Sequence, residues 1–252
     1  MSRVRAGGDA LIEDTKANGE LKPVSGRKTV HDLVYEQLRD ALMSGAFEAR
    51  KLFTIASLSE RFNTSHMPVR EALRRLASEN ALRISSGGTA YVPAITALEL
   101  RDISRARIII EGATARLAGP RMTQTDIDAL EQILARHRDS ASAGDIVEMT
   151  AANRAFHFQV YRAAGSPVLL SQIENLWLRS GPYVRYLSDR MADLLKSDHR
   201  NDFTDLHVTM IKAIKMGDAE ALGAACEADI QASQDLLLDF LANEDEIVQL
   251  TR

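Results

Sequence analysis

The stretch from Ser65 to Leu82, SHMPVREALRRLASENAL, constrains the fold of this chain more than any other. Ser65 can cap a helix, and Pro68 suits the first turn because a proline there removes an N–H that has no helical partner anyway. Apolar residues recur on one side at helical spacing and arginines project elsewhere: Val69, Leu73 and Leu76 against Arg70, Arg74 and Arg75. We therefore expect an amphipathic helix, beginning at Met67 or Pro68, with one face packed inward and another able to meet anions.

The neighbouring segments complete a small domain around this helix. Apolar stripes predict two helices before it, over residues 30–44 and 55–62, and Asn63 with Thr64 forms the turn between the second of these and Ser65. After it, residues 82–85 and 89–92 flank Ser86, Gly87 and Gly88, which predicts a tight β-hairpin. Three helices followed by a hairpin make a winged helix-turn-helix, expected over residues 28–93.

The remaining sequence contains no alternating strand pattern. Helical stripes separated by glycine and proline predict six helices, over residues 96–118, 123–143, 145–164, 167–188, 203–216 and 219–241. The expected fold class is therefore mainly α, with a winged helix-turn-helix followed by an all-α helical bundle over residues 94–243. Residues 1–27 lack apolar periodicity and are expected to form a flexible N-terminal arm, and residues 244–252 a C-terminal tail.

Charge and cysteine content indicate a cytoplasmic protein with a more basic N-terminal part. The net charge is −4, but residues 1–95 carry 14 Lys and Arg against 11 Asp and Glu, whereas the remainder carries 17 against 24. The part that contains the predicted winged helix is thus where phosphate contacts are expected. Cys226 is the only cysteine, which excludes an intramolecular disulfide, and no secretion signal or membrane-spanning apolar run is present.

DNA is the partner that the first domain favours. A helix fits the major groove of B-DNA, where arginines reach phosphates or bind guanine edges, while the small residues of the hairpin tip let its backbone approach the duplex. A lone arginine on a helix is more often a solvated charge, but one placed between a helix-turn-helix and a wing favours a DNA contact. The predicted DNA-binding residues are Ser65, His66, Arg70, Arg74, Ser86 and Gly87.

This stretch resembles the GntR family of bacterial transcription regulators. The resemblance rests on PVREALRRLASENAL, the upstream LSERF and the glycine wing. The chain departs from the usual family pattern at His66, where arginine is typical, at Met67, where threonine is typical, and at Arg50, where a turn glycine is typical. Because His66 cannot reproduce an arginine fork, the family's operator preference does not transfer to this chain.

Arg107 stands out in the first predicted bundle helix because it lies on an otherwise apolar stripe. An arginine directed at a core requires an anionic partner. That partner is either Glu111, one turn further on, or the carboxylate of a ligand, and the sequence leaves both open. Arg185, between Val184 and Tyr186, is a second candidate for binding an anionic ligand.

Four further polar residues share inward helical faces with apolar neighbours: Asn153, His157, His207 and Asp229. Each histidine taken singly is more often a hydrogen-bonded core residue than a ligand. Together, two imidazoles, a carboxylate and an amide can converge on one divalent cation such as zinc, nickel or manganese. The sequence thus predicts a candidate metal site within the bundle.

The C-terminal half is similar to the FCD ligand-binding domain of the FadR subfamily. The resemblance is carried by Arg107 to Glu111, Asn153 to His157, and His207 to Asp218. It implies a metal held by one aspartate and three histidines, with a small organic acid bound beside it. Here Asn153 stands where aspartate is usual and Asp229 where the last histidine is expected, so one carboxylate would be kept on the other side of the cavity.

The expected function is therefore a ligand-responsive, DNA-binding transcription regulator. We expect a homodimer on a double-stranded operator, acting as a repressor of metabolic genes that a small carboxylate releases. Two alternatives remain: a metal-dependent enzyme domain fused to a DNA-binding module, and a constitutive DNA binder with a purely structural metal. Neither a catalytic residue nor a membrane partner is predicted.

Overall fold

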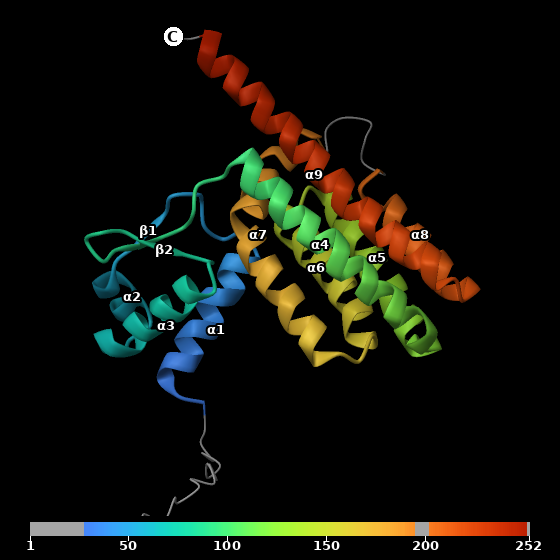
Figure 1. The fold of residues 1–252 in the computed structure, drawn as a ribbon, viewed down its shortest axis with the longest axis horizontal. Helices are drawn as coiled ribbons and strands as arrows, with labels where there is room; N and C mark the ends of the chain where they lie inside the picture. The colour runs from blue at the N-terminus through green and yellow to red at the C-terminus, as the bar shows by residue number, and fades with distance from the viewer. Residues whose placement is uncertain (1–27, 195–201, 251–252) are drawn as a thin grey trace, which may run out of the picture.

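The structure is a computed structural model and describes residues 28–194 and 202–250. Figure 1 shows the winged-helix part beside a bundle of longer helices. The elements in chain order are α1 (Val30–Met43), β1 (Leu52–Phe53), α2 (Ile55–Arg61), α3 (His66–Ser78), β2 (Arg83–Ile84), β3 (Ala90–Tyr91), α4 (Ala97–Ala118), a 3-10 turn (Gly119–Arg121), α5 (Gln124–Ala143), α6 (Ile146–Ala163), α7 (Pro167–Leu194), α8 (Asp202–Met216) and α9 (Ala219–Leu250).

The expected winged helix-turn-helix is present. Strands β2 and β3 form the predicted hairpin, with Ile84 opposite Ala90, and β1 pairs with the other edge of β3 to give the order β1-β3-β2. Strand β1 was not predicted, because two residues are too short to show a period. Strand β1 brings the turn that precedes it, which contains Arg50, next to the end of β3. There the Arg50 N–H donates to the Val92 carbonyl over 3.0 Å.

Two local details near α3 differ from expectation. The helix begins at His66, one residue earlier than predicted, and Ser65 is the N-cap by backbone conformation but makes no side-chain capping hydrogen bond. Ser65 thus takes the predicted N-cap position, but without the side-chain hydrogen bond that a serine cap usually makes. Arg50 adopts a left-handed φ of 66°, so an arginine occupies the turn where the resembled family uses glycine.

The bundle also matches the predicted helices, with two extensions. Helix α7 runs to Leu194, and α9 runs to Leu250, so most of the expected tail at residues 244–252 continues as helix. The expected arm at residues 1–27 lies outside the described residues. Helix α4 lies along α9, α5 packs on α6 and α8, and α7 connects the bundle to α1 (Figure 1). In the described ranges, no helix is long and apolar enough to cross a membrane.

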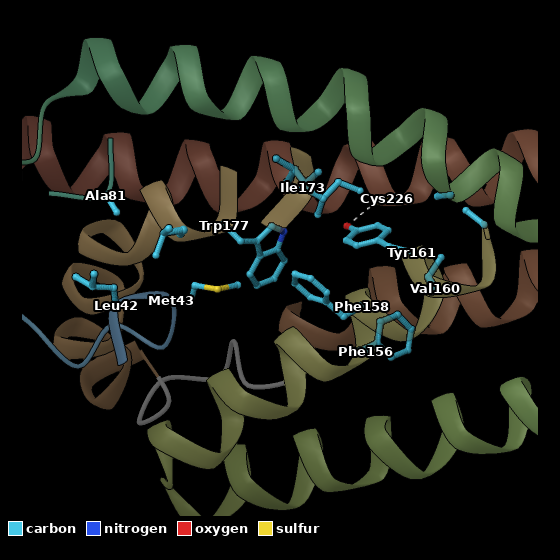
Figure 2. Close-up of a cluster of buried hydrophobic side chains, with 14 of the residues drawn as sticks. Leu42, Met43, Ala81, Phe156, Phe158, Val160, Tyr161, Ile173, Trp177 and Cys226 are labelled. Atoms are coloured by element: carbon cyan, nitrogen blue, oxygen red, sulfur yellow. Dashed lines mark hydrogen bonds between the residues drawn. The ribbon is translucent and has the colours of Figure 1, made fainter. Parts of the chain in front are cut away.

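The hydrophobic core runs without interruption from the winged helix into the bundle. Its buried cluster includes Leu42 and Met43 from α1 together with Ile173 and Trp177 from α7. Figure 2 shows Met43 at the end of α1 pointing toward the Trp177 ring. The backbones touch nearby, because a Cβ built on Gly181 would overlap the Leu42 carbonyl oxygen. The two parts therefore pack as one body.

Candidate functional site

Helix α3 presents one polar face to solvent. Its opposite face is buried through Val69, Ala72, Leu73 and Leu76. The exposed residues at its N-terminal half are Ser65, His66, Met67, Arg70, Glu71 and Arg74. The helical phase predicted from the sequence is confirmed, and it leaves this end of α3 uncovered.

The arginines of α3 differ in the contacts that their side chains make within the protein. Arg75 lies 3.7 Å from the centre of the Tyr35 ring and pairs with Glu79 at 3.3 Å, so it serves the fold. Arg74 bonds Glu71 over 3.1 Å on the surface. Arg70 is exposed and makes no ion pair or hydrogen bond through its side chain within the described part of the chain. Its guanidinium is free to meet a base edge or a phosphate.

The tip of the wing is also exposed. Ser86 and Gly87 occupy the turn, which the Gly88 N–H closes by donating to the Ser85 carbonyl over 2.9 Å. Gly88 has a φ of 81°, a conformation that a glycine adopts without strain. No bulky side chain at this turn would keep its backbone away from a duplex.

Inside the bundle, three of the four predicted metal-ligating residues come together. His157 of α6, His207 of α8 and Asp229 of α9 point ligand atoms at one another. His157 Nε2 lies 3.1 Å from Asp229 Oδ2 and 3.3 Å from His207 Nε2, and His207 Nε2 lies 3.8 Å from Asp229 Oδ1. Both histidines are buried, and Asp229 is 17% exposed through its side chain.

A hydrogen-bonded chain behind His157 determines which of its nitrogens carries the proton. Tyr161 Oη lies 2.5 Å from the Glu111 carboxylate and 3.1 Å from His157 Nδ1. A carboxylate only accepts, so the single phenolic proton goes to Glu111 and the tyrosine oxygen accepts from His157 Nδ1–H. In the neutral ring, His157 Nε2 is then a lone pair that faces the Asp229 carboxylate.

That arrangement fits a cation. A lone pair and a carboxylate oxygen 3.1 Å apart repel each other unless a proton or a metal lies between them. Nitrogen ligands at zinc–nitrogen distances of about 2.0–2.1 Å in a tetrahedron are about 3.3 Å apart, close to the separation of the two imidazole nitrogens. Two imidazoles and one carboxylate also suit nickel or manganese.

Arg107 has the protein partner that was one of its two predicted alternatives. Its Nε donates to Glu111 over 2.7 Å and its Nη2 over 3.3 Å, and its guanidinium lies 4.6 Å from the Trp177 ring centre. Glu111 is fully buried and also accepts from Trp177 Nε1 over 3.1 Å. Arg107 nevertheless lines a cavity, and its Nη1 bonds no acceptor within residues 28–194 and 202–250.

This cavity connects the predicted ligand and metal residues. It has a volume of about 460 Å³ and is lined by Arg107, Asn153, His157, Arg185 and Asp229, among others. Asn153 is half-buried there, one turn before His157. Arg185 bonds Asp189 over 2.9 Å, so it too has a protein partner. The cavity also reaches residues 43–46 at the end of α1.

His137 of α5 belongs to this neighbourhood, and the sequence-based prediction missed it. Its ring centre lies 5.4 Å from that of His207, and Nδ1 of each ring is buried with no hydrogen-bond partner in the described residues. Burial lowers the pKa of His137 to about 4 and that of His207 to about 3. The sequence did contain a signal for His137: its helical spacing from Leu130 and Leu134 places it on the buried face of α5.

Cys226 is a buried neighbour of the cluster, as expected for a small apolar side chain. Its Sγ lies 3.5 Å from Tyr161 Oη, the contact drawn in Figure 2. Burial raises the pKa of the Cys226 thiol, so it remains protonated at neutral pH. Its role here is packing rather than ligation.

Comparison with known proteins finds relatives of both halves. The family "Bacterial regulatory proteins, gntR family" matches residues 31–92, and the FCD domain matches residues 102–232. The transcriptional regulator McbR of Escherichia coli K12 is 29% identical over 220 residues, covering 87% of this chain and 96% of that protein. The gluconate operon transcriptional repressor of Bacillus subtilis 168 is 27% identical over 212 residues, covering 81% and 83%.

A solved structure shares the fold over nearly the same length. The structure of E. coli McbR/YncC superposes with a TM-score of 0.78 at 27% identity, covering 85% of this chain and all of that chain. These similarities span α3, the wing and the bundle together. They apply to the whole described architecture rather than to one part of it.

Proposed function

Since the chain belongs to the GntR family of bacterial transcription regulators and carries their FCD domain, we propose that it is a repressor released by a small organic acid. In this proposal the winged helices of a homodimer bind a palindromic operator, and the acid binds in the bundle cavity beside a divalent metal. The protein acts in the cytoplasm, where operator DNA lies. Its relatives are transcription regulators, and it is a regulator rather than an enzyme.

The observation that carries the DNA-binding part is the unpartnered Arg70 on the open face of α3. A charged side chain that pairs with no carboxylate in the described part of the chain is available for a guanine edge or a phosphate. His66 and Met67 flank it, and the tip at Ser86 and Gly87 lies in the same domain, able to approach the neighbouring backbone. Arg74 gives up its ion pair with Glu71 and binds a DNA phosphate instead.

In this proposal the metal and the acid bind next to each other in the bundle cavity, each held by its own residues. In this proposal His157, His207 and Asp229 hold the metal. Asn153, which lines the same cavity one turn before His157, supplies an amide oxygen as the fourth ligand. The metal supplies a positive charge that attracts a carboxylate. Arg107 offers Nη1 to the same carboxylate, with Glu111 and Trp177 holding its guanidinium in place.

In this proposal the acid releases DNA because the cavity wall includes residues of the winged-helix part. Residues 43–46, which follow α1 of the winged helix, form part of its wall. An acid that fits one placement of α1 better than another shifts the spacing of the two recognition helices in the dimer by its differential affinity, typically ~1–3 kcal/mol. The repressor sign is supported by a relative whose name describes an operon repressor.

Operator binding measured with matched variants tests this function. Wild type should bind a fragment from the upstream region of its own gene far more tightly than random DNA, and Arg70→Ala should lose about 10-fold or more of that affinity. Arg101→Ala, an exposed arginine on α4, is the control and should leave operator binding unchanged. Equal binding of operator and random DNA by wild type would contradict the proposal.

The same titration separates the sensor from a constitutive binder. Small organic acids added to the metal-loaded protein should weaken operator binding, and elemental analysis of protein purified without chelator should find a bound divalent metal. Operator affinity that no acid changes, with metal present, would instead favour a purely structural metal.

A further inference from the structure

One positively charged side chain of the cavity, that of Arg154, was not singled out from the sequence. Arg154 of α6 is half-buried and lines the cavity together with Arg107 and Arg185. Arg107 is paired with Glu111 and Arg185 with Asp189. The Arg154 side chain makes no ion pair or hydrogen bond to any described residue. Among the three arginines that line the cavity, Arg154 is thus the one that pairs with no carboxylate of the described residues.

An unpaired guanidinium in a partly buried position calls for an anion. Removing a charge from water is costly unless a partner replaces the lost hydration, and the two other arginines of the cavity show how this chain supplies one. Asp229, the carboxylate at the metal end, is already in contact with His157 and His207. Asp189, the other carboxylate that lines the cavity in the described residues, is paired with Arg185, which leaves a ligand to bring negative charge to Arg154.

The position of Arg154 on α6 defines where that charge lies. It is three residues before His157, hence on a neighbouring part of the same helical face, about one turn of ~5 Å away along the helix. Asn153 and Thr150 line the same stretch of cavity. An acid whose first carboxylate lies at the metal and Arg107 would extend along α6 and bring a second anionic group to Arg154.

We propose that Arg154 is a specificity-determining residue and that the effector is a short dianionic acid, such as a dicarboxylate, rather than a monocarboxylate. This inference rests on the proposed function, because it assigns the second end of the same ligand. Arg107 and the metal select for an acid, and Arg154 selects for the second charge. A monocarboxylate of equal length leaves Arg154 unpaired, and its apolar end faces a guanidinium.

Binding of matched acids to the full-length, manganese-loaded protein tests the assignment. The probes are succinate, glutarate and adipate, each compared by calorimetry with butyrate, pentanoate and hexanoate. At least one dicarboxylate should bind about 10- to 100-fold more tightly than its monocarboxylate, which corresponds to one charge-assisted hydrogen-bonded pair. In Arg154→Gln this preference should disappear, while the monocarboxylate affinity stays the same.

Arg162→Gln provides the matched control, because Arg162 is an exposed arginine further along the same helix. It should keep the dicarboxylate preference, and both variants should melt within a few degrees of wild type. Equal affinities for the two acid series, or a preference that survives in Arg154→Gln, would overturn the role of Arg154 while leaving the proposed sensor intact. If no acid of either series binds, both the dianion assignment and the acid-sensing part of the proposed function are contradicted.

Discussion

His157 occupies the end of a hydrogen-bonded chain that begins at Arg107. Glu111 accepts from Arg107, Trp177 and Tyr161, and Tyr161 in turn accepts from His157 Nδ1–H. Groups behind a metal-ligating histidine set its tautomer and orient its ring. The same buried carboxylate thus holds the cavity arginine and prepares the neighbouring imidazole.

Tyr161→Phe should weaken metal binding without removing a ligand. The phenol oxygen that accepts from Nδ1–H is lost, so His157 no longer prefers the tautomer with a free Nε2, and metal affinity should fall by about 10- to 100-fold. Titration with zinc against a competing chelator measures this change. In ¹⁵N-histidine spectra of the metal-free protein, His157 should shift from the Nδ1–H tautomer to a mixture.

Cys226→Ala is the control for this substitution, since it removes a third group in contact with Tyr161 Oη, beside Glu111 and His157. It should leave the tautomer and the metal affinity unchanged. A Tyr161→Phe protein with wild-type metal affinity and an unchanged His157 tautomer would show that the phenol only packs.

His137 makes the stability of the metal-free protein depend on pH. Its pKa is about 4 in the folded chain, mainly through burial, against 6.5 for a free imidazole. Between these values the unfolded chain binds a proton that the folded chain does not, so the stability present above pH 6.5 is lost as the pH falls toward 4. The loss is about 1.4 kcal/mol per pH unit for one such histidine.

Urea unfolding with chelator at pH 7 and pH 5 measures this effect. His137→Gln cannot titrate, so its free energy of unfolding should fall less between the two pH values than that of wild type. His207, whose pKa is lowered to about 3, accounts for part of the remaining dependence. The same pH dependence in His137→Gln and wild type would contradict the buried, neutral state of His137.

At the scale of elements, the contact between α1 and α7 joins the DNA-binding part to the bundle. Gly181 lets the two backbones approach at Leu42, and further along α7 polar contacts join it to α1 and to the C-cap residue of α3. Arg39 of α1 pairs with Glu174 of α7 at 2.9 Å, and Asn175 Nδ2 donates to the Glu79 carbonyl over 3.2 Å. The placement of α1 therefore depends on α7, which also lines the cavity.

Gly181→Ala should push these helices apart. Alanine favours a helix interior over glycine by about 1 kcal/mol, but its Cβ would meet the Leu42 backbone, and relieving such overpacking typically costs ~1–3 kcal/mol. We expect a net loss of stability in urea unfolding and a changed emission of Trp177, the only tryptophan.

Ser180→Ala, at the adjacent position of α7, adds no atom and provides the comparison. Its emission should resemble that of wild type. An alanine at position 181 that left both stability and emission unchanged would mean that α1 and α7 are less closely packed than the structure indicates.

At the scale of the whole molecule, the winged helix and the bundle share one hydrophobic core. The predicted boundary near residue 93 separates two sequence patterns, whereas the buried cluster crosses it through Leu42, Met43 and Trp177. An effector in the cavity consequently lies against both parts at once. Coupling between acid and DNA then requires only that the two states differ in the packing of α1 against α7.

Much of this protein follows from the sequence by itself, because the signals are local. Helical periods, glycine and proline separators and the small-residue turn at Ser86 and Gly87 are properties of neighbouring residues, and they predicted the helices of the bundle, the wing and the exposed face with Arg70. The same phase argument brought His157, His207 and Asp229 to inward faces, and the structure places them together.

The tertiary structure decided the questions that depend on how distant helices meet. It selected Glu111 as the protein partner of Arg107, gave Arg154 no partner among residues 28–194 and 202–250, and added His137 to the cluster. It also placed the end of α1 in the wall of the cavity. Periodicity states which face of a helix is buried, but only the packing of helices far apart in the chain determines which residue that face meets.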